Sequence, residues 1–301
     1  VMTGAYGAFG GKSYEYAVGS IRASAHQPIS KEKMARIAEA DLETAKKLIE
    51  ECGYPPVGEG KTVYDSIEAE KNRMTVFVRD IAPDEELVSA MLFEEDALNL
   101  KLYLKARLLG RDDFKSLPTV SGSINPDIFE VCIAAEDFSV LGEEAEKELA
   151  GVFDETDAAR VSGRADRAMF LRALGAVEKK HCRPLESLFI KYADCKNRIT
   201  ALRMRKLGLH DSDCPYAFLP VRIDKEVSLE DFSADENKDE NEIIAMANDK
   251  LSVEMADLGY EAGMGAIAEY FFAKKSEAAK LRYLFAEKSL GGNNDNGGDA
   301  R

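Results

Sequence analysis

The sequence predicts an all-α protein. Of its 301 residues 45% are apolar and 32% are charged, with no Trp and nine Pro, and residues that favour helices are plentiful. Apolar residues recur at helical spacing along most of the chain, whereas the alternation typical of strands is scarce. One chemical pattern also occurs three times at fixed offsets, which favours three similar helical units.

The expected helices are separated by Gly, Pro and polar clusters. A Gly/Pro joint is expected at 53–60 and an irregular acidic loop at 209–236, while 1–11 and 292–301 are expected to be flexible ends. In order, the helices are expected over roughly 14–24, 30–38, 42–52, 61–78, 84–109, 126–134, 143–157, 164–180, 184–207, 239–258 and 261–290.

Helix 84–109 is the clearest of these, because Pro83 and an acidic first turn precede it and Gly110 is placed to end it. Its apolar residues form two lines, so we expect it to be buried on two sides at the centre of a bundle. Helix 261–290 has the same character. The lines are Leu98, Leu102, Leu109 and Leu100, Leu104, Leu108 in the first helix, and Ile267, Phe271, Leu281, Phe285 and Phe272, Ala279, Tyr283 in the second.

The repeated pattern is an acidic residue, Asn or Lys three positions later, a basic residue at offset eleven, and Leu-Gly at offsets thirteen and fourteen. Offsets of three, seven and eleven return to one side of a helix, so each copy forms a polar stripe. The copies are Asp96, Asn99, Arg107, Leu109-Gly110; Asp194, Asn197, Arg205, Leu207-Gly208; and Glu277, Lys280, Lys288, Leu290-Gly291.

Two interpretations of the stripes remain open. Their side chains can form helix-surface bonds and packing contacts within each bundle, or they can face a central opening or the joints between units. The repeat places unit boundaries near Gly110 and Gly208 and predicts units at 12–110, 111–208 and 209–291.

Charge and cysteine content exclude several classes of protein. A net charge of −15 repels nucleic acid and anionic lipid headgroups, and no apolar run is long enough to span a bilayer. The five cysteines show no CxxC pair and no paired spacing, which argues against a disulfide framework and favours a reduced cytoplasmic setting.

Sequence motifs for catalysis or cofactor binding are missing as well. Gly11-Lys12-Ser13 lacks the earlier glycine of a phosphate-binding loop, and His26, His181 and His210 have no partners at metal-ligand spacing. We therefore predict no catalytic residue, no metal and no cofactor, and we expect the chain alone neither to hydrolyse ATP nor to bind it tightly.

Four segments together resemble the C subunit of V/A-type ATPases and ATP synthases, and are similar to subunit d of the eukaryotic vacuolar enzyme. No single one is diagnostic, but their order and spacing are specific over about residues 12–291. They are YEYAVGSIR at 14–22, DALNLKLYLKARLL at 96–109, ADCKNRITALRMRK at 193–206 and EYFFAKKSEAAKLRYLFAEK at 269–288.

The resemblance implies a funnel of three helical bundles around a pseudo-threefold axis. Such a subunit is a non-catalytic adaptor of the central stalk: it caps the membrane rotor ring, receives the rotor shaft and transmits torque between ATP chemistry and proton or sodium transport. It implies a peripheral position on the cytoplasmic face of the membrane, held by ring and shaft subunits rather than by lipid insertion.

The resemblance also adds two interface candidates to the stripes, Lys101 and Arg282. In the middle copy Ile199 occupies the corresponding position, and Lys280 stands where the other copies have Asn. A helical scaffold and an all-helical enzyme remain alternatives. The first would show two-helix repeats of about 34 to 47 residues, and the second a convergent polar pocket.

Overall fold

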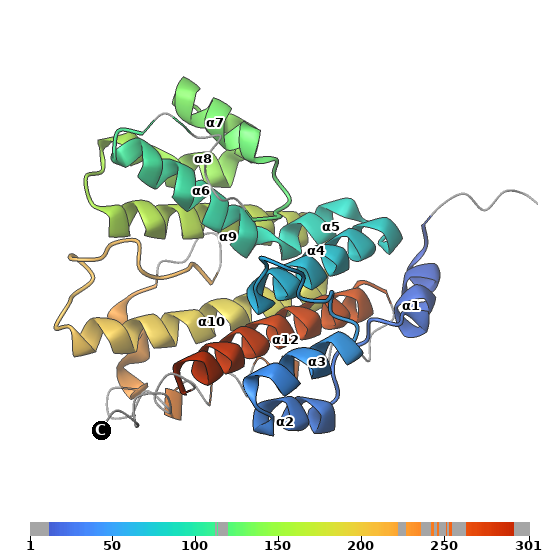
Figure 1. Cartoon of the computed structure of the whole chain (residues 1–301). Coiled ribbons are helices and arrows are strands. Elements are labelled where there is room, and N and C mark those ends of the chain that lie inside the picture. The colour runs from blue at the N-terminus through green and yellow to red at the C-terminus, as the bar shows by residue number, and fades with distance from the viewer. Residues whose placement is uncertain are drawn as a thin grey trace, which may run out of the picture. The chain divides into compact units, whose positions relative to one another are not determined.

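The computed structural model describes residues 12–111, 113, 120–221, 227–235, 242–243, 246, 251, 253–254 and 263–291 (Figure 1). Within these residues the regular structure is helical and contains no strand, which confirms the all-α prediction. The ends 1–11 and 292–301 and most of the predicted helix 239–258 lie outside the described residues. No helix in the described part combines the length and the apolar character needed to cross a bilayer.

The chain divides into two compact units, Val1–Pro83 with Leu258–Arg301, and Asp84–Asp257. We call them the first unit and the second unit. The first unit joins the two ends of the sequence, and the second is continuous. The three units predicted from the repeat, and their arrangement as a funnel, stay predictions.

The first unit has five helices among its described residues: α1 Tyr14–Ala23, α2 Lys31–Glu39, α3 Leu42–Glu51, α4 Val63–Ile81 and α12 Met264–Gly291. Side chains of Ser13, Ser30, Asp41 and Thr62 cap the first four at their N-termini. Helix α12 packs on α1, α3 and α4. Its residues Leu281 and Phe285 are fully buried in a core shared with α2, α3 and α4.

The second unit is built around α9 Ala158–Lys179, which packs on α5 Glu85–Met91, α6 Phe93–Leu108, α8 Glu143–Leu149 and α10 Arg183–Lys206. Helix α7 Pro126–Ala135 packs on α6, and the short 3-10 turns η2 Ser139–Leu141, η3 Val152–Asp154 and η4 Leu229–Asp235 lie between the longer helices. Aromatic rings from three helices meet in the core, where Phe93 lies 5.3 to 5.5 Å from the rings of Phe170, Phe189 and Tyr192.

The predicted helix 84–109 is wrong as a single element, because the chain breaks at Leu92 between α5 and α6. At Leu92 the backbone has φ −94° and ψ 12°, and its N–H bonds to the carbonyl of Ser89 in a tight turn. Leu92 and Phe93, the two residues at the break, are both buried. The predicted helix 143–157 is also wrong as a single element, because α8 ends at Leu149 and Gly151, with φ 73°, precedes the 3-10 turn η3.

The prediction that helices 84–109 and 261–290 are buried on two sides is also wrong. One line of each is buried, as Leu100 and Leu104 show in α6. The other line reaches solvent, with exposed fractions of 51% at Leu98, 77% at Leu109 and 68% at Tyr283. Each helix therefore packs on one side and leaves apolar side chains on the other.

Candidate functional site

The three copies of the repeat lie on α6, α10 and α12, which we call the spine helices. The predicted site residues on them differ widely in burial. Asp96, Asn99, Asn197 and Glu277 are buried; Lys101, Asp194, Arg205 and Lys288 are half-buried; and Arg107, Lys280 and Arg282 are exposed.

The two repeated asparagines have the same function in the fold. The amide of Asn99 donates to the carbonyl of Val120 at 2.8 Å and accepts from the N–H of the same residue at 2.8 Å. Asn197 makes the same pair of bonds to Leu219, both at 2.7 Å. Each asparagine therefore holds a later segment of the chain against its own spine helix. Its amide does so with two hydrogen bonds to one residue, one donated and one accepted.

The acidic residues of the first and third copies hold the start of a short helix. One carboxylate oxygen of Asp96 accepts from the N–H of Ser123 at 2.7 Å and of Ile124 at 3.0 Å, and Ile124 directly precedes the N-cap of α7. Glu277 accepts from the N–H of Ile29, which directly precedes the N-cap of α2. A carboxylate here also compensates the positive end of the helix dipole.

The basic residues of the same two copies hold the other end of that helix. Arg107 reaches the carboxylate of Glu136, the C-cap residue of α7, at 3.5 Å. Lys288 donates to the carbonyl of Ala38 at 2.7 Å and to that of Ala40, the C-cap of α2. Eleven residues of helix rise about 16 Å, close to the length of a nine- or ten-residue helix, so the offset in the repeat matches the helix that the stripe holds.

The two residues added by the family resemblance connect two of the three spine helices, α6 and α12, each to a long neighbour in its own unit. Lys101 pairs with Asp166 of α9 at 2.8 Å, and Arg282 pairs with Glu68 of α4 at 3.0 Å. Both pairs are partly solvated, so each contributes about 1 kcal/mol or less to stability. Ile199, at the corresponding position of the middle copy, is uncharged and cannot form such an ion pair.

In the middle copy the acidic and basic residues have different partners from those in the other two copies. Asp194 pairs with Arg198 one turn later at 3.0 Å, and Arg198 also binds the buried Asp235 of η4. Arg205 donates to the carbonyl of Leu229 at 3.0 Å. Residues 222–226 of this copy lie outside the described residues.

Asp96 gives a testable pH dependence. Burial raises the pKa of its carboxyl above the usual range, although hydrogen bonds from Ser123 and Ile124 lower it. Between the unfolded pKa of about 3.9 and the raised folded pKa, the folded chain binds more protons, so this carboxyl makes the fold less stable as pH rises through that window.

We expect Asp96→Asn to gain stability relative to the unchanged protein on going from about pH 4 to about pH 7. The amide oxygen can still accept the two backbone bonds, and the amide nitrogen can donate to the Ser123 hydroxyl. Urea unfolding at both pH values measures the difference between the two proteins. A difference that is the same at both values would contradict the assignment.

A buried ionic cluster in the first unit surrounds Glu277. The Lys274 ammonium lies 2.6 Å from Glu277 and 3.2 Å from Glu70, and all three side chains are at most 5% exposed. Tyr54 donates to Glu277, and its pKa is raised by burial and by that carboxylate. Burial likewise raises the pKa of Tyr270 to about 12. Sequence reasoning missed this cluster, although Lys274 and Glu277 share one helix face.

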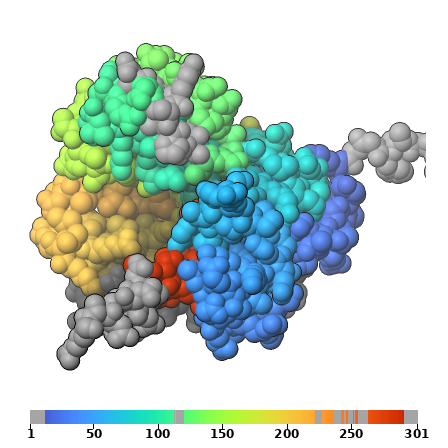
Figure 2. Space-filling view, in the orientation of Figure 1, coloured from blue at the N-terminus to red at the C-terminus, as the bar shows by residue number. Residues whose placement is uncertain are grey.

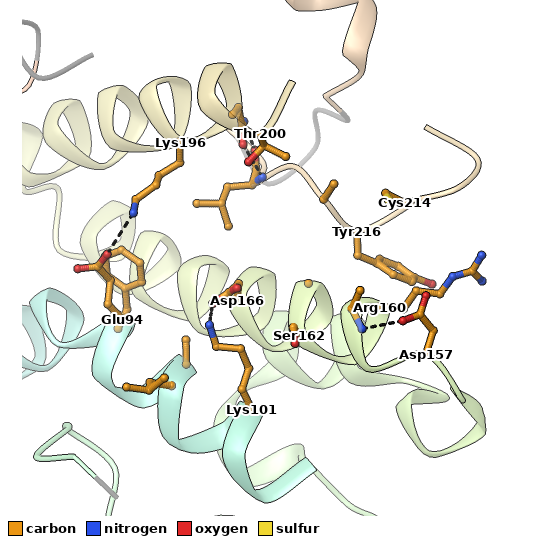
Figure 3. Close-up of a pocket in the computed structure, with 18 of the residues that line it drawn as sticks. Glu94, Lys101, Asp157, Arg160, Ser162, Asp166, Lys196, Thr200, Cys214 and Tyr216 are labelled. Carbon is orange, nitrogen blue, oxygen red and sulfur yellow. Dashed lines mark hydrogen bonds and ion pairs between the residues drawn. The ribbon is translucent and has the colours of Figure 1, made fainter. Parts of the chain in front are cut away.

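The second unit contains a groove of about 650 Å³ between α6, α9, α10 and residues 213–219. In Figure 2 the gold surface of α10 and the chain after it lies directly below the green and teal surface of α6 to α9. Figure 3 shows Lys101 pointing to Asp166 and Lys196 pointing to Glu94 across the groove. Asn197 and Leu219, to which its amide donates, both lie in the lining of the groove.

Two ion pairs join charged side chains of the lining, Lys101 with Asp166 and Lys196 with Glu94, and Asp157 and Asp213 accept from backbone N–H groups. Glu94 also accepts from the hydroxyl of Tyr192, whose pKa is raised well above its usual value by burial and by this carboxylate. In the described part of the chain no three His, Cys, Asp or Glu side chains are placed to hold a metal. The arrangement is one of braces between helices.

Gly163 sets how closely α9 approaches the groove wall. A Cβ at this position would lie 2.5 Å from the carbonyl oxygen of Tyr216, whereas a Cβ at Gly175 of the same helix would meet nothing within 4 Å. We expect Gly163→Ala to lower the free energy of unfolding by about 1 to 3 kcal/mol, and Gly175→Ala to raise it by about 0.5 to 1 kcal/mol. Equal effects in urea unfolding would show that the close approach is not needed.

The structure thus brings each stripe together with the segment that it holds inside one unit. Whether any stripe side chain also faces a central opening or a joint between units stays a prediction.

No curated protein matches this sequence. The model of one protein family, described as ATP synthase (C/AC39) subunit, matches residues 17–240, well over half of the chain. This match covers α6 and α10 with their two asparagines. It confirms the resemblance seen in the sequence, and the chain belongs to the ATP synthase (C/AC39) subunit family of the V/A-type ATPases.

Proposed function

We propose that this chain is a non-catalytic adaptor in the central stalk of a rotary V/A-type ATPase, between the rotor shaft and the membrane ring. Family membership supports a place in such an ATPase. The observation that carries the rest is the bracing of the spine helices: buried polar side chains of α6 and α10 fasten the chain after each helix at two atoms.

Such bracing suits torque transmission. A subunit that passes rotation from one partner to another must resist bending, and it needs no group with a catalytic pKa. Two-way amide bonds and buried ion pairs fix neighbouring segments in direction as well as in distance. The coupled transport of protons or sodium ions is then carried out by other subunits, which this chain connects.

The proposal is tested by binding. The tagged chain is mixed with purified shaft subunits, with the purified membrane ring of the same ATPase, and with both, and the complexes are separated by size-exclusion chromatography. We expect a binary complex with each partner and a ternary complex with both. The catalytic head freed of its shaft is the control and should not bind. A chain that bound neither shaft nor ring would refute the proposal.

A further inference from the structure

Helix α7 of the second unit exposes an apolar side. Its other side packs on α6, where the ring of Phe129 lies 6.0 Å from that of Tyr103. Figure 1 shows α7 at the edge of the second unit. On the side away from Phe129, Val131 is 65% exposed, and the alanines one turn later are exposed as well. This side, which we call the outer face of α7, consists of Asp127, Glu130, Val131, Ala134 and Ala135.

Carboxylates stand at both ends of the apolar middle of this face. Asp127 and Glu130 lie near the start of α7, and Asp137 lies two residues past its last helical residue. Among the described residues, no cation forms an ion pair with any of these three carboxylates. Hydrogen bonds from Ser139 lower the pKa of Asp137, so it stays ionised. The outer face therefore carries negative charge that no cation of the described chain pairs with.

The C-terminal end of α7 lacks the cations that usually compensate the negative end of a helix dipole. Its last turn contains no basic residue, whereas the last turns of α6 and α10 contain two and three. Glu136 and Asp137 follow it directly. Arg107 reaches Glu136 at 3.5 Å, but both side chains are more than half exposed, so this pair contributes little. A cation from a partner would be attracted to this end of the helix.

The charge of this region excludes several kinds of occupant. Residues 120–146 include seven acidic residues and no Lys, Arg or His, so they repel lipid headgroups and nucleic acid. They also repel a second copy of the chain, whose net charge is −15. A bound metal ion is not favoured either, because the part of the chain that the structure describes places no three suitable side chains together. A cationic protein segment with an apolar side matches both the charge and the exposed Val131.

The spacing of the carboxylates fits a helix better than a single basic side chain. The ten residues of α7 rise about 15 Å, so the acidic groups at its two ends are about one helix length apart. A partner helix lying along α7 spans this length with basic residues about eleven positions apart, an offset that keeps them on one side. Apolar residues between them would cover Val131 and the two alanines.

We propose that the outer face of α7 is the docking site of an amphipathic helix of a partner protein, with basic residues at both ends of its apolar side. The basic residues meet Asp127 and Glu130 at one end and Asp137 at the other, and the apolar side covers Val131. Such a helix can dock here whether or not the chain joins a shaft to a membrane ring.

The probe is a synthetic peptide helix with leucines on one side and lysines at both ends of that side, and the control peptide has glutamates in place of the lysines. We expect the full chain to bind only the lysine peptide in fluorescence titrations, more weakly as salt rises. Combining Asp127→Asn, Glu130→Gln and Asp137→Asn should weaken binding about tenfold or more, and Val131→Ser alone about fivefold. The melting temperature should change little at these surface positions.

Matched variants show whether the site is α7. Changing Glu143, Glu144 and Glu146 together to Gln removes as many charges from α8, and Val140→Ser alters a side chain that is 66% exposed; both should bind the peptide as the unchanged chain does. Arg107→Met removes the cation beside Glu136 and should bind no more weakly.

Three results would overturn the inference. The α8 variant could lose as much affinity as the α7 variant, which would reduce the attraction to net charge. The α7 variant and Val131→Ser could both bind as tightly as the unchanged chain. Calcium chloride alone could raise the melting temperature of the unchanged chain but not of the α7 variant, which would identify a cation site instead. If the triple variant does not fold, Val131→Ser against Val140→Ser decides.

Discussion

Changing Lys274 to Met is expected to lower the free energy of unfolding by about 3 to 5 kcal/mol. The ammonium lies between the carboxylates of Glu70 and Glu277 at 3.2 and 2.6 Å, and its side chain is 3% exposed. It also lies 5.0 Å from the centre of the Tyr54 ring. Methionine keeps the length of the side chain but leaves the buried Glu277 without a cation and Glu70 with Arg73 alone.

Urea unfolding measures this loss, and Lys280→Met is the control. It makes the same substitution on the same helix at an exposed position, where changes are usually within about 0.5 kcal/mol. Glu70 keeps its ion pair with Arg73 in this variant, whereas Glu277 loses its cation. Adding Glu277→Gln to Lys274→Met should therefore restore part of the stability, because the second change removes that unpaired charge. Additive losses, or a loss at Lys274 no larger than at Lys280, would show that the three groups do not act as a cluster.

The fold class and most helix positions could be predicted because local signals decide them. Thr62 forms a capping box with Asp65 at the start of α4, and Asn125 with Pro126 opens α7 where a helix was expected. The break at Leu92 could not be predicted in this way. Neither proline nor glycine occurs there, and both residues at the break, Leu92 and Phe93, are buried in the core, which only the packed structure shows.

The repeat could be found in the sequence, but the segments that its side chains bind could not be predicted. Asn99 and Asn197 bind residues that follow them by 21 and 22 positions, a distance at which helix periodicity carries no information. Glu277 binds Ile29 from the opposite end of the chain. Only the path of the chain in three dimensions brings these pairs together.

The hydrogen bond between Glu277 and Ile29 changes how the repeat is interpreted. In the first copy the short helix, α7, follows its spine helix, whereas in the third copy α2 comes from the opening of the sequence. Glu277 and Lys288 still hold its two ends as Asp96 and Arg107 hold those of α7. The third copy is therefore completed by the N-terminal part of the chain, which explains why the first unit contains both ends of the sequence.

Asn99→Ala and Asn197→Ala are each expected to lower the free energy of unfolding by about 2 to 3 kcal/mol. Each change leaves one backbone N–H and one carbonyl without the partner they have at 2.7 to 2.8 Å, and an unpaired buried polar group costs about 1 to 3 kcal/mol. The two asparagines bind different segments, so the double variant should show the sum of the single losses.

Asparagine-to-aspartate variants test the accepted and the donated hydrogen bond of the amide separately. In Asn99→Asp one carboxylate oxygen can still accept from the N–H of Val120, but the other faces the carbonyl oxygen that the amide bonded at 2.8 Å. That contact favours a protonated carboxyl, which raises its folded pKa. Since the folded chain then binds the extra proton, the variant should lose stability relative to the unchanged protein as pH rises from about 4 to about 7.

Lys280→Ala provides the comparison across copies, because Lys280 occupies the same repeat position as the two asparagines and is exposed. It should change stability by less than about 0.5 kcal/mol. Circular dichroism during urea unfolding measures all of these variants on one scale. If the asparagine variants lose no more than Lys280→Ala, the two-way bonds do not fasten the chain after the spine helices. The stiffness argument for a torque-transmitting adaptor would then lose its main support.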